Sequence, residues 1–275
     1  MLERWRFRFT LVIVAALWAS WCGAGFGAPQ NTELQKAVDS SFRSAQDKER
    51  DRYRHPVQTL TFFGIEPNMT VVELWPFGGW YTAILAPFLK AHGQLYAAAM
   101  DPQSTDPEDR EYNKELRALF DAHPEQFDRV KMTVLAPGKM HIAPDGSADM
   151  VLTFRNIHNW VWAGIETDVF SAAYRALKPG GVLGVVEHRS DDPQAVPKRG
   201  QAYVGEQYAI RLIESAGFRL VARSDINRNP KDTKNYPNGV WALPPTYANG
   251  DQDRARYQAI GESDRFTLKF VKPRQ

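Results

Sequence analysis

Cysteine is nearly absent from the sequence, since Cys22 is the single one among 275 residues. It lies in an N-terminal segment that we expect to be an export signal. The mature chain would then carry neither a thiol nor a disulfide, and it would tolerate an oxidising compartment. A lipid anchor on Cys22 is the alternative, although the bulky Trp21 before it departs from the small residue that lipoprotein processing prefers.

An excess of either charge is also missing, because 34 lysines and arginines stand against 32 aspartates and glutamates, for a formal net charge of +2. Nucleic-acid binding needs clustered positive charge, so we expect no nucleic-acid partner. The partner that we expect is a small-molecule substrate. The composition carries no signal for an oligomeric state.

The motifs of several enzyme classes are missing as well. The six histidines show no metal-ligand spacing and no cysteine of the mature chain can join them, so we expect no metal site. The sequence has no Gly-Lys-Ser or Gly-Lys-Thr of a phosphate-binding loop and no Gly-x-Ser-x-Gly nucleophile elbow. Chemistry that depends on those two motifs is therefore not expected.

The N-terminus has the pattern of a secretory signal peptide. Met1–Thr10 contains three arginines and one acid, Leu11–Trp21 is almost wholly apolar, and small residues follow up to Ala28. The apolar run is about half of the ~20 residues that a membrane-spanning helix needs. We predict a signal over residues 1–28, cleaved near Gly27 or Ala28, and a periplasmic or secreted protein. A buried N-terminal helix and an uncleaved membrane anchor are the alternatives.

Behind the signal we expect a helical cap over residues 29–56 and one further domain over residues 57–275. The 43% of hydrophobic residues is enough for a single α/β core. Between Asn31 and Arg54, apolar residues recur at three- and four-residue spacing, which predicts one amphipathic helix. His55-Pro56 ends or bends this helix, because the residue before a proline disfavours helical backbone angles.

After the cap, short β-like runs alternate with helical stretches, which is typical of a mostly parallel sheet with helices on both faces. Seven strands fit one doubly wound, Rossmann-like sheet. We expect strands at Thr70–Leu74, Gln94–Met100, Val130–Leu135, Asp149–Phe154, Gly181–Glu187, Phe218–Ser224 and Arg265–Val271. We expect helices at Gly79–Ala91, Pro107–Ala122, Ile165–Leu177 and Gly205–Ala216. The sequence also predicts a turn at Lys178–Gly181 and a long loop at Asp225–Gly250, of the kind that often covers a binding site.

The most informative stretch is Thr70–Thr82. A hydrophobic strand is followed by the acid Glu73, by a turn that contains Gly78 and Gly79, and by a helix. This order builds a ligand crevice at the carboxyl end of the strand.

Three further motifs follow in order along the chain. Ala97–Asp101 ends a strand with an acid, Asp149–Trp160 ends another strand with polar residues, and Arg175–Glu187 comprises a helix, a Lys-Pro-Gly-Gly turn and a strand. Together the four motifs resemble class I S-adenosylmethionine (SAM)-dependent methyltransferases, in particular exported predicted methyltransferases with a Glu-Leu-Trp-Pro-x-Gly-Gly-Trp-Tyr motif. The resemblance covers residues 54–271. It implies a seven-stranded sheet with an antiparallel last strand, SAM as cofactor, and methyl transfer to a small-molecule or exported substrate.

The resemblance also implies which residues bind the cofactor. Glu73 would lie beneath the amino-acid portion of SAM, and Gly78 and Gly79 would let the backbone approach it closely. Asp101 would accept the two ribose hydroxyls. Asn156, after the fourth strand, would orient the adenine ring or the substrate.

The cofactor turn departs from the family pattern, because its three alternating glycines fall on Trp75, Phe77 and Gly79. If position 77 needs a positive φ, a bulky residue there costs about 1 to 2 kcal/mol, and its ring would also take up ligand space. The opposite interpretation is that the aromatic faces of Trp75 and Phe77 attract the positive sulfonium of SAM. For Trp80 and Tyr81, packing of the helix against the sheet is the simpler interpretation.

Methyl transfer requires positioning of the acceptor, and a base when the acceptor carries a proton. His158, just beyond the fourth predicted strand, is our candidate base, although it could instead hydrogen-bond the loop. His55, Asn159 and His188 are candidate substrate-binding residues, since we expect them near the same edge of the sheet. Glu187-His188-Arg189 could equally be a solvated strand end.

Two other functions compete with methyl transfer. The first is a non-catalytic ligand-binding protein on a methyltransferase fold, which the bulky residues in the glycine turn favour. The production of SAM in the cytoplasm, outside the predicted compartment, favours it too. The second is a nicotinamide-dependent oxidoreductase, which is disfavoured because the Gly-x-Gly-x-x-Gly turn that seats a pyrophosphate is missing.

Overall fold

One mostly parallel sheet organises the chain. The computed structural model describes residues 29–274, so the predicted signal at 1–28 lies outside the described residues. Seven strands hydrogen-bond in the order β3-β2-β1-β4-β5-β7-β6. They are β1 (Thr70–Leu74), β2 (Gln94–Ala99), β3 (Lys131–Val134), β4 (Ala148–Phe154), β5 (Leu177–His188), β6 (Arg219–Ser224) and β7 (Arg265–Val271). Only β7 runs antiparallel to its neighbours, β5 and β6. The predicted fold class and the antiparallel last strand are confirmed.

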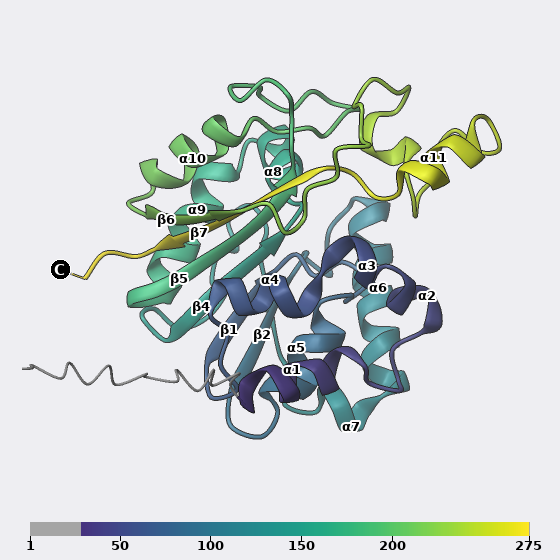
Figure 1. Cartoon of the computed structure of the whole chain (residues 1–275). Helices are drawn as coiled ribbons and strands as arrows, with labels where there is room; N and C mark the ends of the chain where they lie inside the picture. Colours follow the sequence, from purple (N-terminus) through teal and green to yellow (C-terminus); the bar gives the residue numbers. More distant parts are fainter. Residues whose placement is uncertain (1–28, 275) are drawn as a thin grey trace, which may run out of the picture.

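Helices cover both faces of this sheet (Figure 1). Their bounds are α1 (Pro29–Val38), α2 (Ala45–Glu49), α3 (Asp51–Arg54), α4 (Pro56–Phe63), α5 (Thr82–Leu89), α6 (Pro107–Ala122), α7 (Pro124–Phe127), α8 (Ile157–Ala163), α9 (Glu166–Ala176), α10 (Glu206–Ser215) and α11 (Arg254–Ile260), with a 3₁₀ turn η1 (Gly239–Ala242). One apolar core lies between the sheet and α8, α9 and α10, and a second lies between the opposite face and α1, α4 and α5. No helix of residues 29–274 is long and apolar enough to cross a membrane.

The N-terminal cap differs from the single helix predicted between Asn31 and Arg54. The structure has three short helices there, α1, α2 and α3. Arg43 folds back and donates to the carbonyl of Val38 at 2.5 Å, and the Ser44 hydroxyl accepts the N–H of Asp47 at 3.0 Å and starts α2. The apolar spacing holds in α1, which buries Leu34 and Val38, but not in α2, which buries no residue. The polar side chains between these helices satisfy backbone groups that a continuous helix would use.

Two predictions about the second half of the chain have different outcomes. The expected turn at Lys178–Gly181 is wrong, because these residues belong to β5. The pairing of β5 with β4 shifts register there, and Gly180 adopts a φ of +84°. The expected loop at Asp225–Gly250 is confirmed apart from η1. Since β1 to β5 are parallel, their carboxyl ends meet at one edge of the sheet, and this loop returns the chain beside that edge.

Candidate functional site

A cavity of about 620 Å³ opens at the carboxyl edge of the sheet. Its volume lies in the range of small-molecule sites. The ends of β1, β4 and β5 supply Glu73, Phe154 and His188, and the first turns of α6 supply Glu108 and Tyr112. Residues of α2 and α3, η1 and the start of β7 complete the walls. The cavity is therefore built from segments that are as much as 218 residues apart in the sequence, from Asp47 to Arg265.

The turn after β1 keeps the backbone of a glycine turn although two of its glycines are replaced. Trp75, Phe77 and Gly79 all have positive φ, of 45°, 50° and 82°. At Gly79 an added Cβ would lie 2.6 Å from a methyl carbon of Leu119, so a larger residue would displace Leu119 and strain the backbone at a φ of 82°. Trp75 and Phe77 hold a conformation that L-residues rarely adopt, and such strain concentrates at ligand sites.

The side chains of this turn make an aromatic wall. The Trp75 indole donates to the carbonyl of Leu135 at 2.8 Å and lies edge-on to Trp160, with ring centroids 5.8 Å apart. Phe77 lies edge-on to Tyr112, with centroids 4.6 Å apart. Trp75, Phe77 and Tyr112 all line the cavity. The two large residues at glycine positions are thus fixed in place and shape the cavity.

Glu73 forms the floor beneath this turn. Its side chain is buried and accepts the hydroxyl of Thr82 at 2.7 Å. Burial raises the pKa of Glu73 to about 7, and the hydrogen bond from Thr82 opposes this rise only in part. At neutral pH the carboxyl therefore exists both protonated and ionised, which suits a group that meets a cationic ligand.

Replacing Glu73 with glutamine is expected to change how stability depends on pH. Because the folded pKa of about 7 exceeds the ordinary value of 4.5, the folded state keeps a proton that the unfolded state releases. The resulting stabilisation is complete below pH 4.5 and is lost as the pH rises to 7, and it amounts to about 3 kcal/mol. In urea unfolding, the free energy of unfolding of the wild type should fall relative to that of Glu73→Gln between pH 4.5 and pH 7. At pH 7.5 the variant should be the more stable protein. Glu111→Gln, at an exposed position, is the control. If the stability of the wild type and of Glu73→Gln changed with pH in the same way, the prediction would be contradicted.

A histidine and a glutamate form a buried pair at the ends of β4 and β5. His158 Nδ1 lies 3.2 Å from Glu187 Oε1, and both side chains are buried. The carboxylate also accepts the backbone N–H groups of Ile157 at 2.7 Å and His188 at 2.8 Å. Since a carboxylate accepts, Nδ1 carries the proton, and the Nε2 lone pair of His158 is left for a ligand of the cavity. This is the arrangement of an oriented general base.

The fold also brings a second histidine next to this pair. Ligand atoms of His158, Glu187 and His188 all lie within 4.8 Å of one another, a proximity that the sequence spacing did not indicate. His188 Nδ1 contacts the Ser263 hydroxyl at 2.6 Å, and burial, then His158, lowers the pKa of His188 well below its usual range. Because both oxygens of Glu187 already accept hydrogen bonds, we interpret the group as an oriented base beside a neutral histidine. The absence of a metal stays a prediction.

Four of the ten predicted site residues lie outside the cavity wall. Glu73, Trp75, Gly78, His158, Asn159 and His188 line the cavity; Gly79, His55, Asp101 and Asn156 do not. Gly79 is buried under α6, and His55 joins α3 to α4 with a φ of 41°.

Asp101 and Asn156 are engaged by other parts of the protein. Asp101 accepts Lys139 Nζ at 2.6 Å, and this hydrogen bond holds the pKa of the carboxyl below its usual range. Asn156 is buried and donates to the carbonyl of Leu74 at 2.8 Å and to Thr153 at 3.1 Å. Asn156 therefore ties the end of β1 to β4 and supports the turn after β1 from behind.

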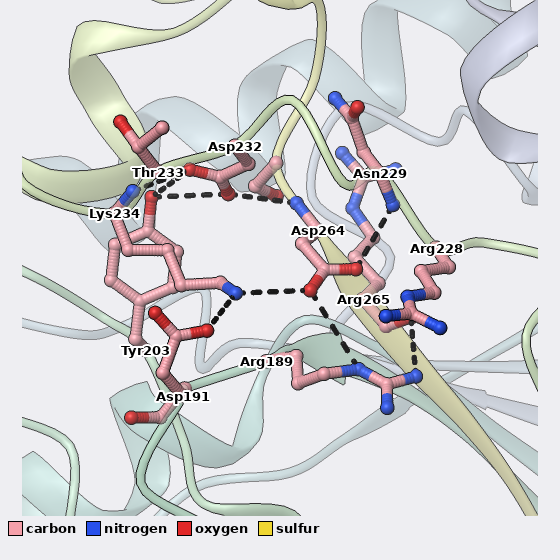
Figure 2. A network of polar contacts seen from close by, with 12 residues as sticks. Arg189, Asp191, Tyr203, Arg228, Asn229, Asp232, Thr233, Lys234, Asp264 and Arg265 are labelled. Atoms are coloured by element: carbon pink, nitrogen blue, oxygen red, sulfur yellow. Dashed lines mark hydrogen bonds and ion pairs between the residues drawn. The ribbon is translucent and has the colours of Figure 1, made fainter.

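The loop at Asp225–Gly250 brings Val240, Trp241 and Thr246 to the cavity. A polar network fixes it to the sheet (Figure 2). Asp232 accepts the Tyr203 hydroxyl at 3.0 Å and the backbone N–H of Asp264 at 2.8 Å. Lys234 lies 3.1 Å from Asp264, to which Arg189 is also adjacent. The loop is therefore a fixed wall of the cavity.

Sequence reasoning missed the charged end of the cavity. Arg50, Arg54, Arg155 and Arg265 surround the buried Glu262, and all five line the cavity. They come from α2–α3, from the residue after β4 and from the start of β7. No local motif joins these segments, so only the fold could reveal the cluster.

The comparisons with known proteins identify the fold. No family model matches the chain, and no curated protein matches it by sequence. Among solved structures, the chain is similar to a SAM-dependent methyltransferase from Aquifex aeolicus, at 16% identity and a TM-score of 0.54, over 88% of this chain and 98% of that one. It is also similar to the [4+2]-cyclase SpnF, at 14% identity and a TM-score of 0.57, over 89% and 93%. A SAM-dependent methyltransferase from Methanosarcina mazei matches at 10% identity and a TM-score of 0.52, over 78% and 98%.

These similarities show that the chain has the fold of class I SAM-dependent methyltransferases. One of the similar proteins is a [4+2]-cyclase, so this fold also serves other chemistry. The function must therefore be argued from the cavity itself.

Proposed function

We propose that the chain is a SAM-dependent methyltransferase that acts on a small molecule. The observation that carries the proposal is the turn after β1, in which positions 75, 77 and 79 keep positive φ above the buried acid Glu73. A backbone that holds two bulky residues in a strained conformation needs a reason, and close approach to a ligand supplies one. The fold and the oriented His158 support the same conclusion.

The residues fit SAM at its amino-acid and sulfonium portions. Glu73 and Gly78 would hold the amino-acid portion, and the aromatic faces of Trp75, Phe77 and Tyr112 suit a positively charged sulfonium. At the ribose, Asp101 is paired with Lys139, whose side chain is half exposed. Because exposed ion pairs contribute little, ribose hydroxyls can replace Lys139 at small cost.

The protein's own part in the reaction is to orient the acceptor and to remove its proton. When bound, SAM supplies an electrophilic methyl group. His158 Nε2 accepts a proton from a hydroxyl, amine or thiol of the acceptor, while Glu187 holds the ring in the required tautomer. Asn159 and His188 line the same cavity and would contact the acceptor. Since His188 is neutral, it can hydrogen-bond the acceptor without adding charge.

The export signal and the periplasmic or secreted location stay part of this proposal. They rest on the N-terminal pattern alone and are tested by fractionation of a C-terminally tagged chain together with mass measurement of the mature protein. A cytoplasmic chain of unchanged mass would contradict both.

A non-catalytic binding protein on the same fold is the second candidate. The engagement of Asp101 by Lys139 and of the Trp75 indole by the carbonyl of Leu135 favours it, because the resemblance places Asp101 at the ribose and Trp75 beside the sulfonium. Calorimetry of residues 29–275 with S-adenosylhomocysteine, SAM and NAD separates the two candidates. Binding of both adenosyl compounds without NAD supports the methyltransferase. Absence of binding for all three compounds supports the non-catalytic protein.

Replacing Phe77 with glycine is expected to weaken the binding of SAM more than the binding of S-adenosylhomocysteine. The aromatic ring attracts the sulfonium but not the neutral thioether, so the ratio of the two affinities should fall about fivefold. Relief of the strained φ and loss of the contact with Tyr112 are each about 1 kcal/mol and oppose each other, so the melting temperature should change little. Calorimetric titration of both compounds measures the ratio. Tighter binding of both would show instead that the ring obstructs the site.

A further inference from the structure

The charged end of the cavity holds more positive than negative charge. Glu262 accepts Arg50 Nε at 2.7 Å, Arg54 Nε at 3.1 Å and Arg265 Nη2, while Arg155 Nη1 lies 3.9 Å away, beyond hydrogen-bond distance. The Glu262 side chain is 2% exposed, so it is shielded from water. Four guanidinium groups thus share one buried carboxylate.

Several donors of this cluster have no acceptor among residues 29–274. Arg54 is 3% exposed, and within these residues its Nη1 is buried without a hydrogen-bond partner, as is Arg265 Nε. Arg155 makes no hydrogen bond through its side chain within the described part of the chain, and it holds a φ of 65°, a strained value for a residue other than glycine. Buried donors without partners are costly, and Arg54 and Arg265, which carry two of them, line the cavity beside the partly exposed Arg155, so the cluster suits a further anionic ligand.

The acid–base behaviour of the cluster agrees with this geometry. Burial, followed by repulsion from Arg54, lowers the pKa of Arg155 well below its usual range, and burial lowers the pKa of Arg54 to about 10. For Glu262, burial acts in the opposite direction, but Arg54 and its neighbours outweigh it and hold the pKa well below the usual range. The carboxylate is fully ionised and still leaves the guanidinium groups undercompensated.

We infer that Arg54 and Arg155 form an anion subsite that binds a carboxylate of the methyl acceptor. The planar fork of a guanidinium group matches a carboxylate, and a buried charge-assisted hydrogen bond is strong. Because His158 lines the same cavity, the acceptor would carry its carboxylate at one end and its nucleophile at the other. The identification of the carboxylate as the acceptor's rests on the proposed function; the anion subsite itself does not.

Calorimetric titration of the chain with malonate tests the subsite, with uncharged malonamide as the ligand control. We expect saturable malonate binding to the wild type, no binding of malonamide, and a loss of malonate affinity of about tenfold to a hundredfold in Arg155→Gln. Arg155 is the residue to change because its contact with Glu262, at 3.9 Å, is not a hydrogen bond, so the three hydrogen-bonded arginines that hold Glu262 stay in place. Arg223→Gln, at a half-exposed position on β6 outside the cavity, is the matched control and should bind malonate like the wild type.

SAM has a carboxylate of its own, and titration of the same variants with S-adenosylhomocysteine and 5′-methylthioadenosine distinguishes this source. Unchanged affinity of Arg155→Gln for S-adenosylhomocysteine supports the assignment to the acceptor. Loss of that affinity, with unchanged affinity for 5′-methylthioadenosine, which lacks the amino-acid portion, overturns it. Absence of malonate binding to the wild type, or equal malonate affinity in wild type and Arg155→Gln, overturns the subsite. The chain could bind malonate through Arg155 and yet not bind S-adenosylhomocysteine. That result would support the anion subsite and contradict only the proposal that the chain is a methyltransferase.

Discussion

Replacing His158 with glutamine is expected to lower the rate of methyl transfer by a factor of about 10² to 10⁴, the usual contribution of a positioned general base. The expectation follows from the pair with Glu187, which fixes Nδ1 at 3.2 Å and leaves Nε2 to the cavity. The measurement is the formation of S-adenosylhomocysteine from labelled SAM, with the best acceptor among hydroxy and amino carboxylic acids. Binding of S-adenosylhomocysteine should stay unchanged, because His158 acts on the acceptor.

The pH profile separates lost base catalysis from lost structure. Without the base, the acceptor must lose its proton to solvent, so the rate of His158→Gln should rise about tenfold per pH unit below the pKa of the acceptor. His92→Gln, at an exposed position outside the cavity wall, should match the wild type. A flat profile in His158→Gln with normal cofactor binding would show that His158 only hydrogen-bonds the loop.

Much of the fold could be predicted because its signals are local. The bounds of β1, β7 and α6 in the structure are those predicted, since a strand or helix with a strong apolar period and a clear start depends little on distant residues. Helix α6 begins at Pro107, where the side chain of Asp106 accepts the N–H of Glu108. The N-terminal cap was predicted less well, because the contacts of Arg43 and Ser44 that divide it are not visible in apolar spacing.

The candidate site could be predicted where it follows strand ends and not where it depends on tertiary contacts. His158 follows β4, and His188 ends β5. Because these strands are parallel neighbours, the sheet brings the two histidines together. Asp101 also ends a strand, but Lys139 from the turn after β3 competes for it. The arginine cluster could not be predicted, because it forms only where α3 packs against the start of β7. Two of its arginines are 208 and 212 residues apart from Glu262 in the sequence, and such pairs leave no local pattern.

Replacing Glu262 with glutamine is expected to lower the free energy of unfolding by about 3 to 5 kcal/mol at pH 7, the cost of breaking a buried ion pair from one side. Arg54 and Arg265 are both nearly inaccessible to water, so they cannot recover by solvation the interaction that they lose. Urea unfolding of the variant measures the loss, and Glu111→Gln, which removes an exposed pair with Lys114, should stay within about 0.5 kcal/mol of the wild type. A loss below 1 kcal/mol would show that water reaches the cluster.

The stability of Glu262→Gln can also be compared with that of the wild type at low pH and in the presence of malonate. Because the folded pKa of Glu262 lies below its ordinary value of 4.5, its stabilisation is present above pH 4.5 and is lost as the pH falls through the folded pKa. The difference in stability between wild type and Glu262→Gln should therefore shrink in acid. Malonate should restore stability to Glu262→Gln more than to the wild type, since it supplies the negative charge that the arginines have lost, and binding to the folded state stabilises it. Equal stabilisation of both proteins would show that malonate does not replace the negative charge that Glu262→Gln removes.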